Sequence, residues 1–189
     1  MKIMISGGLG FIGSHLSEDL LKSKHKIIIL TKNISKKRNI SNFLDKITLE
    51  KVDVTNFNFL KKIILRHKPD VIIHLAGNTS HSKSFENPFL DIDSNIKSTL
   101  NFLEIIRTSN LFCKFILGST FIVIGKPKKL PVTETTECKP TTLYGINRLT
   151  SEYYCKIYHD VYDLDTMIFR ITNSFGPREQ VIPTKNAIN

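Results

Sequence analysis

The chain has few cysteines and no long hydrophobic run, and each shortage excludes a class of protein. The three cysteines, Cys113, Cys138 and Cys155, are odd in number and lack the spacing of zinc ligands, so neither a disulfide framework nor a metal site is expected. No apolar run approaches the roughly 20 residues of a membrane span. The N-terminus lacks the charged and apolar regions of a signal peptide, which predicts a cytoplasmic protein with no membrane partner.

Acidic residues are also scarce, since 17 Asp and Glu stand against 27 Lys and Arg, for a net charge of +10. The basic residues are spread along the chain, with dense groups only at 36–38 and 126–129, and no helix-turn-helix or zinc-finger pattern accompanies them. A lysine-rich solvated surface explains this charge, and a basic cleft that attracts a phosphate-bearing ligand is the second interpretation. Nucleic acid is therefore not an expected partner.

Glycine, in contrast, is concentrated near the N-terminus, directly after an apolar run. Residues 2–5 predict a buried strand, which leads into Gly7, Gly10 and Gly13 before a helical pattern begins. In such a unit Gly7 allows a tight turn, Gly10 lets the backbone approach a phosphate, and Gly13 lets helix and strand pack closely. The segment predicts dinucleotide binding, with the pyrophosphate at the start of the helix.

Short apolar segments alternate with helical patterns along the rest of the chain. Strands that are apolar on both faces and alternate with helices predict a parallel sheet covered on both sides. With right-handed crossovers, this is a Rossmann-type doubly wound α/β fold in one domain. The predicted strands are 2–5, 26–30, 47–52, 71–75, 112–117 and 166–171, and the predicted helices are 11–24, 57–67, 91–108 and 148–162.

A tyrosine and an arginine four residues apart are the candidates for chemistry. Tyr144 and Arg148 lie at the start of the predicted helix 148–162, and a spacing of four places both on one helix face. A cation held beside a tyrosine favours the tyrosinate, which serves as a general base near neutral pH. A packed tyrosine beside a surface arginine explains the same pair, so the residues alone leave both interpretations open.

Further motifs follow one another along the whole chain. They are 6–16, Asp53-Val54, 74–77, the Ser84…Pro88…Asn95 spacing, 118–120 with Gly125, Glu134…Pro140…Tyr144-Gly145, and 170–178. In this order they resemble the extended short-chain dehydrogenases/reductases, the family of nucleotide-sugar epimerases, dehydratases and reductases. The resemblance covers essentially all 189 residues.

The resemblance implies a role for most of these residues. Tyr144 becomes the catalytic acid/base, Thr120 the hydroxyl that hydrogen-bonds the sugar, and Arg148 the cation beside them. Ser84 and Asn173, with Thr120, fall in the substrate site of a nucleotide sugar, and a homodimer through the helix carrying Tyr144 is consistent with the family. The implied cofactor contacts, besides Tyr144 and Arg148, are Gly7, Gly10, Phe11, Ile12, Gly13, Asp53, Val54, Leu75, Ala76, Gly77 and Asn95.

Two departures from the family pattern bear on activity. The family motif is Tyr-x-x-x-Lys, and Arg148 keeps the charge of that lysine in a planar, bulkier fork. Family members also continue past the Gly-Pro-Arg of 176–178 into a smaller substrate domain, of which only the start, near 173–189, is expected in this chain. We predict an active enzyme with adapted geometry, and the alternative is a catalytically impaired dinucleotide-binding protein.

Two more segments predict the cofactor and the reaction. An acidic residue at the end of the second strand usually binds the ribose of NAD, but Thr31-Lys32 stands there with the basic run 36–38 behind it, which favours NADP over NAD. Sugar 4,6-dehydratases of the family carry an Asp-Glu pair after the catalytic threonine, where this chain has Phe121-Ile122. The resemblance therefore favours a UDP-sugar 4-epimerase-like enzyme, with an NADPH-dependent 4-keto-sugar reductase as the alternative.

Overall fold

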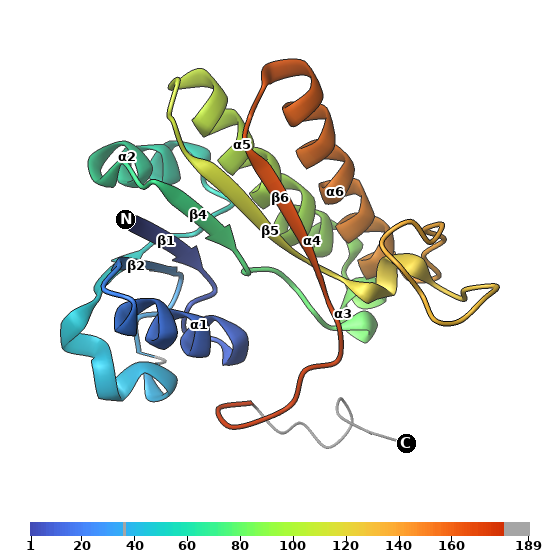
Figure 1. Cartoon of the computed structure of the whole chain (residues 1–189), viewed down its shortest axis with the longest axis horizontal. Helices are drawn as coiled ribbons and strands as arrows, with labels where there is room; N and C mark the ends of the chain where they lie inside the picture. Colours follow the sequence, from blue (N-terminus) through green and yellow to red (C-terminus); the bar gives the residue numbers. More distant parts are fainter. Residues whose placement is uncertain (36, 180–189) are drawn as a thin grey trace.

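A computed structural model describes residues 1–35 and 37–179 and places one parallel sheet between two helical layers (Figure 1). The strands are β1 (Lys2–Ser6), β2 (Lys26–Thr31), β3 (Thr48–Lys51), β4 (Val71–His74), β5 (Lys114–Thr120) and β6 (Thr166–Ile171). Their order in the sheet is β3-β2-β1-β4-β5-β6, and all neighbouring pairs are parallel. The order reverses between β1 and β4, which is where doubly wound sheets bind ligands. The predicted Rossmann-type fold is confirmed.

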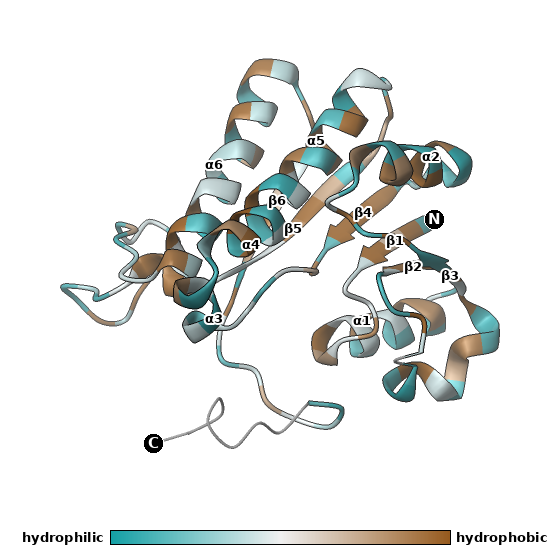
Figure 2. Ribbon diagram, turned by 180° about the vertical axis from the view of Figure 1, so that it is seen from behind, coloured by the Kyte–Doolittle hydropathy of each residue, from teal (hydrophilic) through white to brown (hydrophobic). Residues whose placement is uncertain are grey.

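Helices cover both faces of this sheet, and each layer buries its own apolar cluster (Figure 2). The helical segments are α1 (Phe11–Lys22), η1 (Arg38–Lys46), α2 (Phe57–His67), α3 (His81–Glu86), α4 (Pro88–Ile92), η2 (Asp93–Lys97), α5 (Ser98–Thr108), η3 (Phe121–Ile124) and α6 (Leu143–Tyr162). On the face of α1 and η1, Ile5, Ile29 and Ile40 are fully buried. On the face of α2, α5 and α6, Phe102 and Phe115 form the centre of the larger cluster. Burial of these apolar side chains is the main driving force for the fold.

The helix predicted over 91–108 is broken into shorter segments and starts earlier. Asn87 caps α4 by accepting a hydrogen bond from the Leu90 N–H at 3.0 Å, and Pro88 occupies the first helical position. The π-helical turn η2 then separates α4 from α5, and α3, which was not predicted, precedes them. Such π-helical turns occur often at functional sites, and this one carries Asn95.

Two boundaries next to the carboxyl ends of the strands also differ from the prediction. β5 continues to Thr120 rather than ending at 117, because its last three residues pair with 169–171 of β6. α6 begins at Leu143 rather than 148, because the Thr142 side chain accepts a hydrogen bond from the Gly145 N–H at 3.0 Å. Tyr144 therefore lies within the first turn of α6 and not before it.

All three cysteines are free in the described part of the chain. Burial raises the pKa of Cys113 to about 12 and that of Cys155 to about 12, so both thiols stay protonated. Within residues 1–35 and 37–179, no helix combines the length and the hydrophobicity that crossing a membrane requires.

Candidate functional site

The turn between β1 and α1 has the backbone geometry that its glycines predict. Gly7 has a φ of +78°, and a Cβ there would lie 2.8 Å from the backbone nitrogen of Ala76. A Cβ on Gly13 would collide with the carbonyl oxygen of Gly7, so the first turn of α1 rests directly on the glycine turn. Gly10 is the N-cap of α1 and offers no side-chain cap, which leaves the first N–H groups of the helix for a ligand. The turn is therefore built like an anion site at a helix N-terminus.

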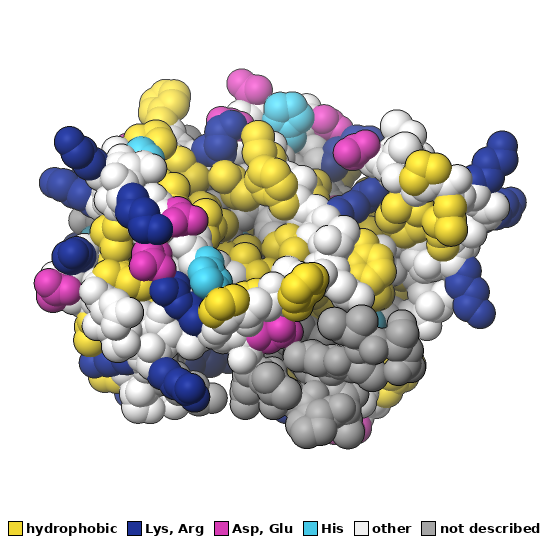
Figure 3. All heavy atoms as spheres, turned by 60° about the horizontal axis from the view of Figure 1, so that its bottom comes forward, with side chains coloured by type: hydrophobic (Ala, Val, Ile, Leu, Met, Phe, Trp, Pro, Cys, Tyr) yellow, Lys and Arg dark blue, Asp and Glu magenta, His cyan; other side chains and the backbone are white. Residues whose placement is uncertain are grey.

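A cleft of about 1500 Å³ extends from this turn to α6 along the carboxyl ends of the strands. Figure 3 shows this side of the molecule, where hydrophobic side chains lie in the recessed middle and lysine and arginine side chains mainly around it. Its described lining is basic, with Lys32, Arg38, Arg148 and Arg178 against Glu179. The predicted site residues in this lining are Gly7, Gly10, Phe11, Ile12, Gly13, Thr31, Lys32, Leu75, Gly77, Thr120, Tyr144, Arg148 and Asn173.

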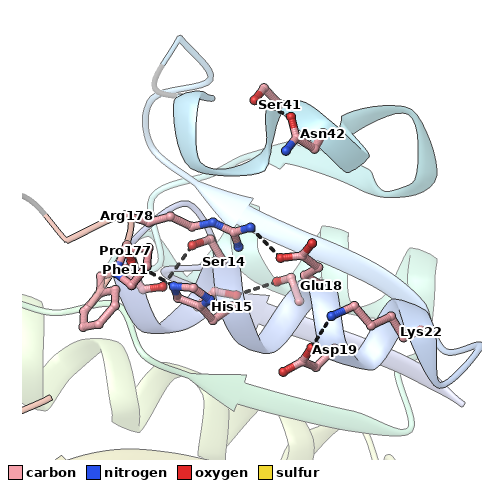
Figure 4. A network of polar contacts seen from close by, with 12 residues as sticks. Phe11, Ser14, His15, Glu18, Asp19, Lys22, Ser41, Asn42, Pro177 and Arg178 are labelled. Carbon is pink, nitrogen blue, oxygen red and sulfur yellow. Dashed lines mark hydrogen bonds and ion pairs between the residues drawn. The ribbon is translucent and has the colours of Figure 1, made fainter. Parts of the chain in front are cut away.

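One wall of the cleft is formed by residues 172–179, which we call the return segment because it passes from β6 back to α1 (Figure 1). Figure 4 shows Pro177 and Arg178 of this segment beside α1. The Nε2 of His15 donates to the carbonyl oxygen of Pro177 at 2.9 Å. The guanidinium of Arg178 forms an ion pair with Glu18, one turn further along α1. These contacts join residues about 160 positions apart and fix the return segment beside the glycine turn.

Tyr144 and Arg148 lie one turn apart in α6, and both line the cleft. Arg148 is only 4% exposed, and its Nη1 donates to the Oδ1 of Asn95 at 3.3 Å. Its Nε has no hydrogen-bond partner among the described residues. Burial lowers the pKa of the Arg148 guanidinium, whereas Tyr144 and Glu152 act in the opposite direction. An arginine stays charged even so, and the site therefore has a buried cation beside its tyrosine.

Thr120 ends β5 and lines the same cleft as Tyr144. Its Oγ1 accepts a hydrogen bond from the N–H of Ile122 at 3.3 Å and so caps η3. This structural role uses the oxygen as acceptor and leaves the hydroxyl hydrogen for a ligand. Phe121 and Ile122 also line the cleft, and neither brings a carboxylate to it.

A buried carboxylate behind Tyr144 and Arg148 was missed at the level of sequence. Asp91, fully buried in α4, accepts hydrogen bonds at 2.6 Å from the side-chain amides of Asn78 and Asn147. Asn78 follows β4 and Asn147 directly precedes Arg148, so the carboxylate joins the loop after β4 to the helix of the site. A single aspartate in a helical pattern gives no signal of this contact, because three separate segments must meet to form it.

His74 at the end of β4 is a second buried polar residue near the site. Its Nδ1 lies 2.6 Å from the Oγ of Ser6 and its Nε2 lies 3.0 Å from the Oγ of Ser98. Burial, and to a lesser degree the charge of Arg148, lower the pKa of His74 to about 3. The imidazole is therefore neutral at physiological pH and links β1, β4 and α5.

His74 should make the fold sensitive to mild acid. Its pKa in the folded state lies far below the ordinary value of 6.5, so the unfolded chain takes up this proton first as the pH falls. The contribution of His74 to stability is complete above about pH 6.5 and is lost between there and about pH 3, with a limiting slope of about 1.4 kcal/mol per pH unit. In urea unfolding, the free energy of unfolding should fall more between pH 7 and pH 5 for the wild type than for His74→Gln. His25→Gln, at a half-buried histidine, serves as the control. If the free energy of unfolding changed equally with pH in His74→Gln and in the wild type, this role of His74 would be refuted.

Lys32 and Asp53, both predicted to contact the cofactor, form an ion pair with each other. The Nζ of Lys32 lies 3.0 Å from the Oδ2 of Asp53, and both side chains are about half exposed. Burial alone would raise the pKa of Asp53, but hydrogen bonds from Thr55 and Lys32 lower it overall. Asp53 lies in a smaller hollow of about 490 Å³ that shares Lys32 with the cleft. Because Lys32 already has a partner, it is a weaker site for a 2′-phosphate than predicted, and Lys36 lies outside the described residues.

Four other predicted residues lie behind the cleft rather than in its lining. Ser84 is fully buried, and its hydroxyl donates to the carbonyl oxygen of His81 at 2.6 Å. Asn95 is equally buried and holds Arg148, as described above. Ser84 and Asn95 thereby support His81 and Arg148, which both line the cleft. The four are Val54, Ala76, Ser84 and Asn95.

Comparison with known proteins identifies the family to which the chain belongs. The family model described as GDP-mannose 4,6-dehydratase matches residues 4–189. The chain belongs to this family. The predicted membership in the extended short-chain dehydrogenases/reductases is thereby confirmed.

Three relatives of this GDP-mannose 4,6-dehydratase family member illustrate the similarity. A putative UDP-glucose 4-epimerase of Methanocaldococcus jannaschii is 32% identical over 177 residues, which cover 94% of this chain and 57% of the relative. A UDP-glucose 4-epimerase of Thermotoga maritima, solved with UDP-glucose, is 29% identical with a TM-score of 0.87, covering 95% of this chain and 58% of the other. A UDP-glucuronic acid 4-epimerase of Bacillus cereus, solved with UDP-glucuronic acid and NAD, is 30% identical with a TM-score of 0.85, covering 95% and 59%. The chain thus spans less than two thirds of the length of these relatives.

Proposed function

We propose that this family member is a nucleotide-sugar 4-epimerase-like enzyme that uses a nicotinamide dinucleotide. The observation that carries the proposal is the meeting of the glycine turn, Thr120 and Tyr144 in one cleft of about 1500 Å³. Relatives whose names give UDP-sugar 4-epimerase activity share the fold over 95% of this chain, which supports the same assignment.

The residues of the cleft fit a dinucleotide. The uncapped N-terminus of α1 offers N–H groups to a pyrophosphate, and the Nε of Arg148 is a buried donor without a partner among the described residues. When bound, the nicotinamide supplies the exchange of hydride with the sugar. We propose that the contacts to it come from the lining residues Gly7, Gly10, Phe11, Ile12, Gly13, Thr31, Lys32, Leu75, Gly77, Tyr144 and Arg148.

In this proposal Tyr144 handles the proton of the reaction. Its Oη takes the proton from a sugar hydroxyl and later returns it, while the hydroxyl of Thr120 donates a hydrogen bond to the same sugar oxygen. The buried charge of Arg148 favours the deprotonated tyrosine while the proton is away. Asn173, which also lines the cleft, is the proposed contact to the nucleotide sugar.

The residues after Thr120 favour epimerisation over loss of water. Elimination of water from a sugar needs an additional acid and base beside the reacting carbons. Phe121 and Ile122 occupy the positions directly after Thr120 and line the cleft with apolar side chains. A reaction that needs only one acid/base group, which removes a proton and returns it, suits this lining.

For the cofactor we propose NAD rather than NADP. The preference for NADP that Thr31 and Lys32 predict finds no support, because Lys32 is paired with Asp53 and the Bacillus cereus relative was solved with NAD. The nicotinamide cofactor itself is common to both interpretations.

Asp53→Asn should shift this preference toward NADP. The substitution removes one negative charge and frees the ammonium of Lys32, and an exposed pair of this kind is worth about 0.2–1 kcal/mol. The ratio of the dissociation constants for NAD and NADP should therefore change by about 1.4- to fivefold in favour of NADP. Asp19→Asn, at an exposed ion pair on α1, is the control. An unchanged ratio in Asp53→Asn would show that Lys32 does not face the adenosine ribose.

We also propose that the chain is a dinucleotide-binding domain over 1–189, with the start of a substrate-binding region near 173–189. Asn173 and the return segment support this division, and residues 180–189 lie outside the described part of the structure. A homodimer through α6 and a cytoplasmic location stay predictions from the sequence.

The proposed function is tested by incubating the protein with NAD and a set of nucleotide sugars that includes UDP-glucose and UDP-glucuronic acid. We expect the two 4-epimers of at least one sugar to interconvert, without net formation of NADH, as followed by chromatography and absorbance. Consumption of NADPH with a 4-keto sugar would favour the reductase instead. Binding of NAD without turnover of any sugar would favour a catalytically impaired dinucleotide-binding protein.

A further inference from the structure

His81 lies beside the proposed acid/base and has no role in the site as described so far. Its ring packs edge-on against the ring of Tyr144, with the centroids 5.3 Å apart and the planes at 74°. Both residues line the cleft, and among the described residues His81 is the only histidine that does so. The side chain is exposed, and neither ring nitrogen has a hydrogen-bond partner among the described residues.

The surrounding structure fixes the backbone of His81 on both sides. The hydroxyl of Ser84 donates to the carbonyl oxygen of His81 at 2.6 Å. On the other side, the Oδ1 of Asn78 accepts from the N–H of Ser80 at 3.1 Å, and the amide of Asn78 donates to the buried Asp91. The same carboxylate holds Asn147 in α6, so the segment of His81 and the helix of Tyr144 are anchored to one buried group.

The role that we assign to His81 from this placement rests on the proposed function. We propose that His81 is a substrate-contacting residue that hydrogen-bonds an oxygen of the sugar next to the carbon on which Tyr144 acts. A neutral imidazole offers one donor and one acceptor, which matches sugar hydroxyls, and its donor also matches a sugar carboxylate. Because its nitrogens have no partner among the described residues, His81 can bind the sugar without breaking an internal contact.

The test measures binding of UDP and UDP-glucose to the NAD-loaded protein by calorimetry. His81→Val removes both ring nitrogens, and we expect the dissociation constant for UDP-glucose to rise about fivefold, in line with the loss of one neutral hydrogen bond. The constants for UDP and NAD should stay unchanged, because the proposal assigns His81 to the sugar alone. His81→Asn, which keeps a donor and an acceptor, should retain part of the affinity for UDP-glucose.

Two further readouts separate contact from a structural role and identify the sugar group. The ring nitrogen resonances of His81 should move on addition of UDP-glucose but not of UDP, with His81→Asn used for the assignment. A larger effect of His81→Val on UDP-glucuronic acid than on UDP-glucose would identify a carboxylate as the bound group, and equal effects a hydroxyl.

The outcomes also separate this inference from the proposed function. If the wild type binds UDP-glucose and His81→Val binds it equally well, the role of His81 is refuted while the proposed function stands. If His81→Val weakens UDP and UDP-glucose alike, the residue is structural and the inference fails. If the wild type binds no nucleotide sugar, the proposed function fails and the role of His81 fails with it.

Discussion

Replacing Tyr144 by phenylalanine should reduce turnover of the nucleotide sugar by about 10²- to 10⁴-fold, the range that a positioned acid/base contributes. The phenolic oxygen is the only atom removed, and the rest of the ring keeps its contact with His81. The Oη of Tyr144 has no hydrogen-bond partner among the described residues, so its removal leaves no other group unsatisfied there. The thermal midpoint should therefore stay within a few degrees of the wild type.

Tyr153→Phe is the matched control, because Tyr153 lies in the same helix and its side chain is 59% exposed. It should keep full turnover and should bind NAD as the wild type does. Single-turnover experiments with saturating NAD isolate the chemical step. Turnover of Tyr144→Phe at the wild-type rate would rule out Tyr144 as the acid/base.

Gly13→Ala should lower the stability of the protein by about 3 kcal/mol, the upper range for an overpacked site. In an ordinary helix the same change is stabilising. Here a Cβ would collide with the carbonyl oxygen of Gly7 and lie 2.7 Å from the Cα of Gly8, both of them backbone atoms that have no rotamer to move to. For a domain of this size the thermal midpoint should fall by about 6 to 12 °C.

Gly10→Ala tests the same turn from the side of the ligand. Gly10 has a φ of −75° and a ψ of 179°, which alanine adopts freely, and a Cβ would lie 3.2 Å from the carbonyl oxygen of Gly7. This variant should lose only about 1 kcal/mol of stability, as an N-cap alanine does. Its methyl group should instead weaken binding of NAD, because it occupies the approach to the N-terminus of α1. A Gly13→Ala protein as stable as the wild type would contradict the packing described for the turn.

Most of the fold could be predicted from the sequence, because the fold depends on local patterns. β6 and α2 have the predicted bounds, and the remaining strands differ by a few residues at their ends. The largest error, the single helix over 91–108, arose because apolar spacing continues through η2, where only the backbone reveals the π-helical turn. Thr142, a typical N-cap residue, signals the early start of α6, whereas the apolar spacing alone places that start at Arg148.

The candidate site was predictable where motifs fix both residue and place. Thr120, Tyr144 and Asn173 come together in one cleft from segments more than 20 residues apart, as the order of parallel strands requires. The pairing of Lys32 with Asp53 was not predictable, because it depends on the register of β2 and β3 and on two side-chain conformations. The position of His81 was not predictable either, because it depends on α3, a short helix that no periodic pattern in the sequence indicates.

The contacts of the return segment determine when the cleft can form during synthesis of the chain. His15 and Glu18 emerge from the ribosome about 160 residues before their partners Pro177 and Arg178. Since chains fold progressively from the N-terminus, we expect the glycine turn to form with β1 and β2 while one side of the cleft is still missing. The proposed dinucleotide site would then gain one of its walls only after residues 172–179 have been added, far along the chain from the glycine turn.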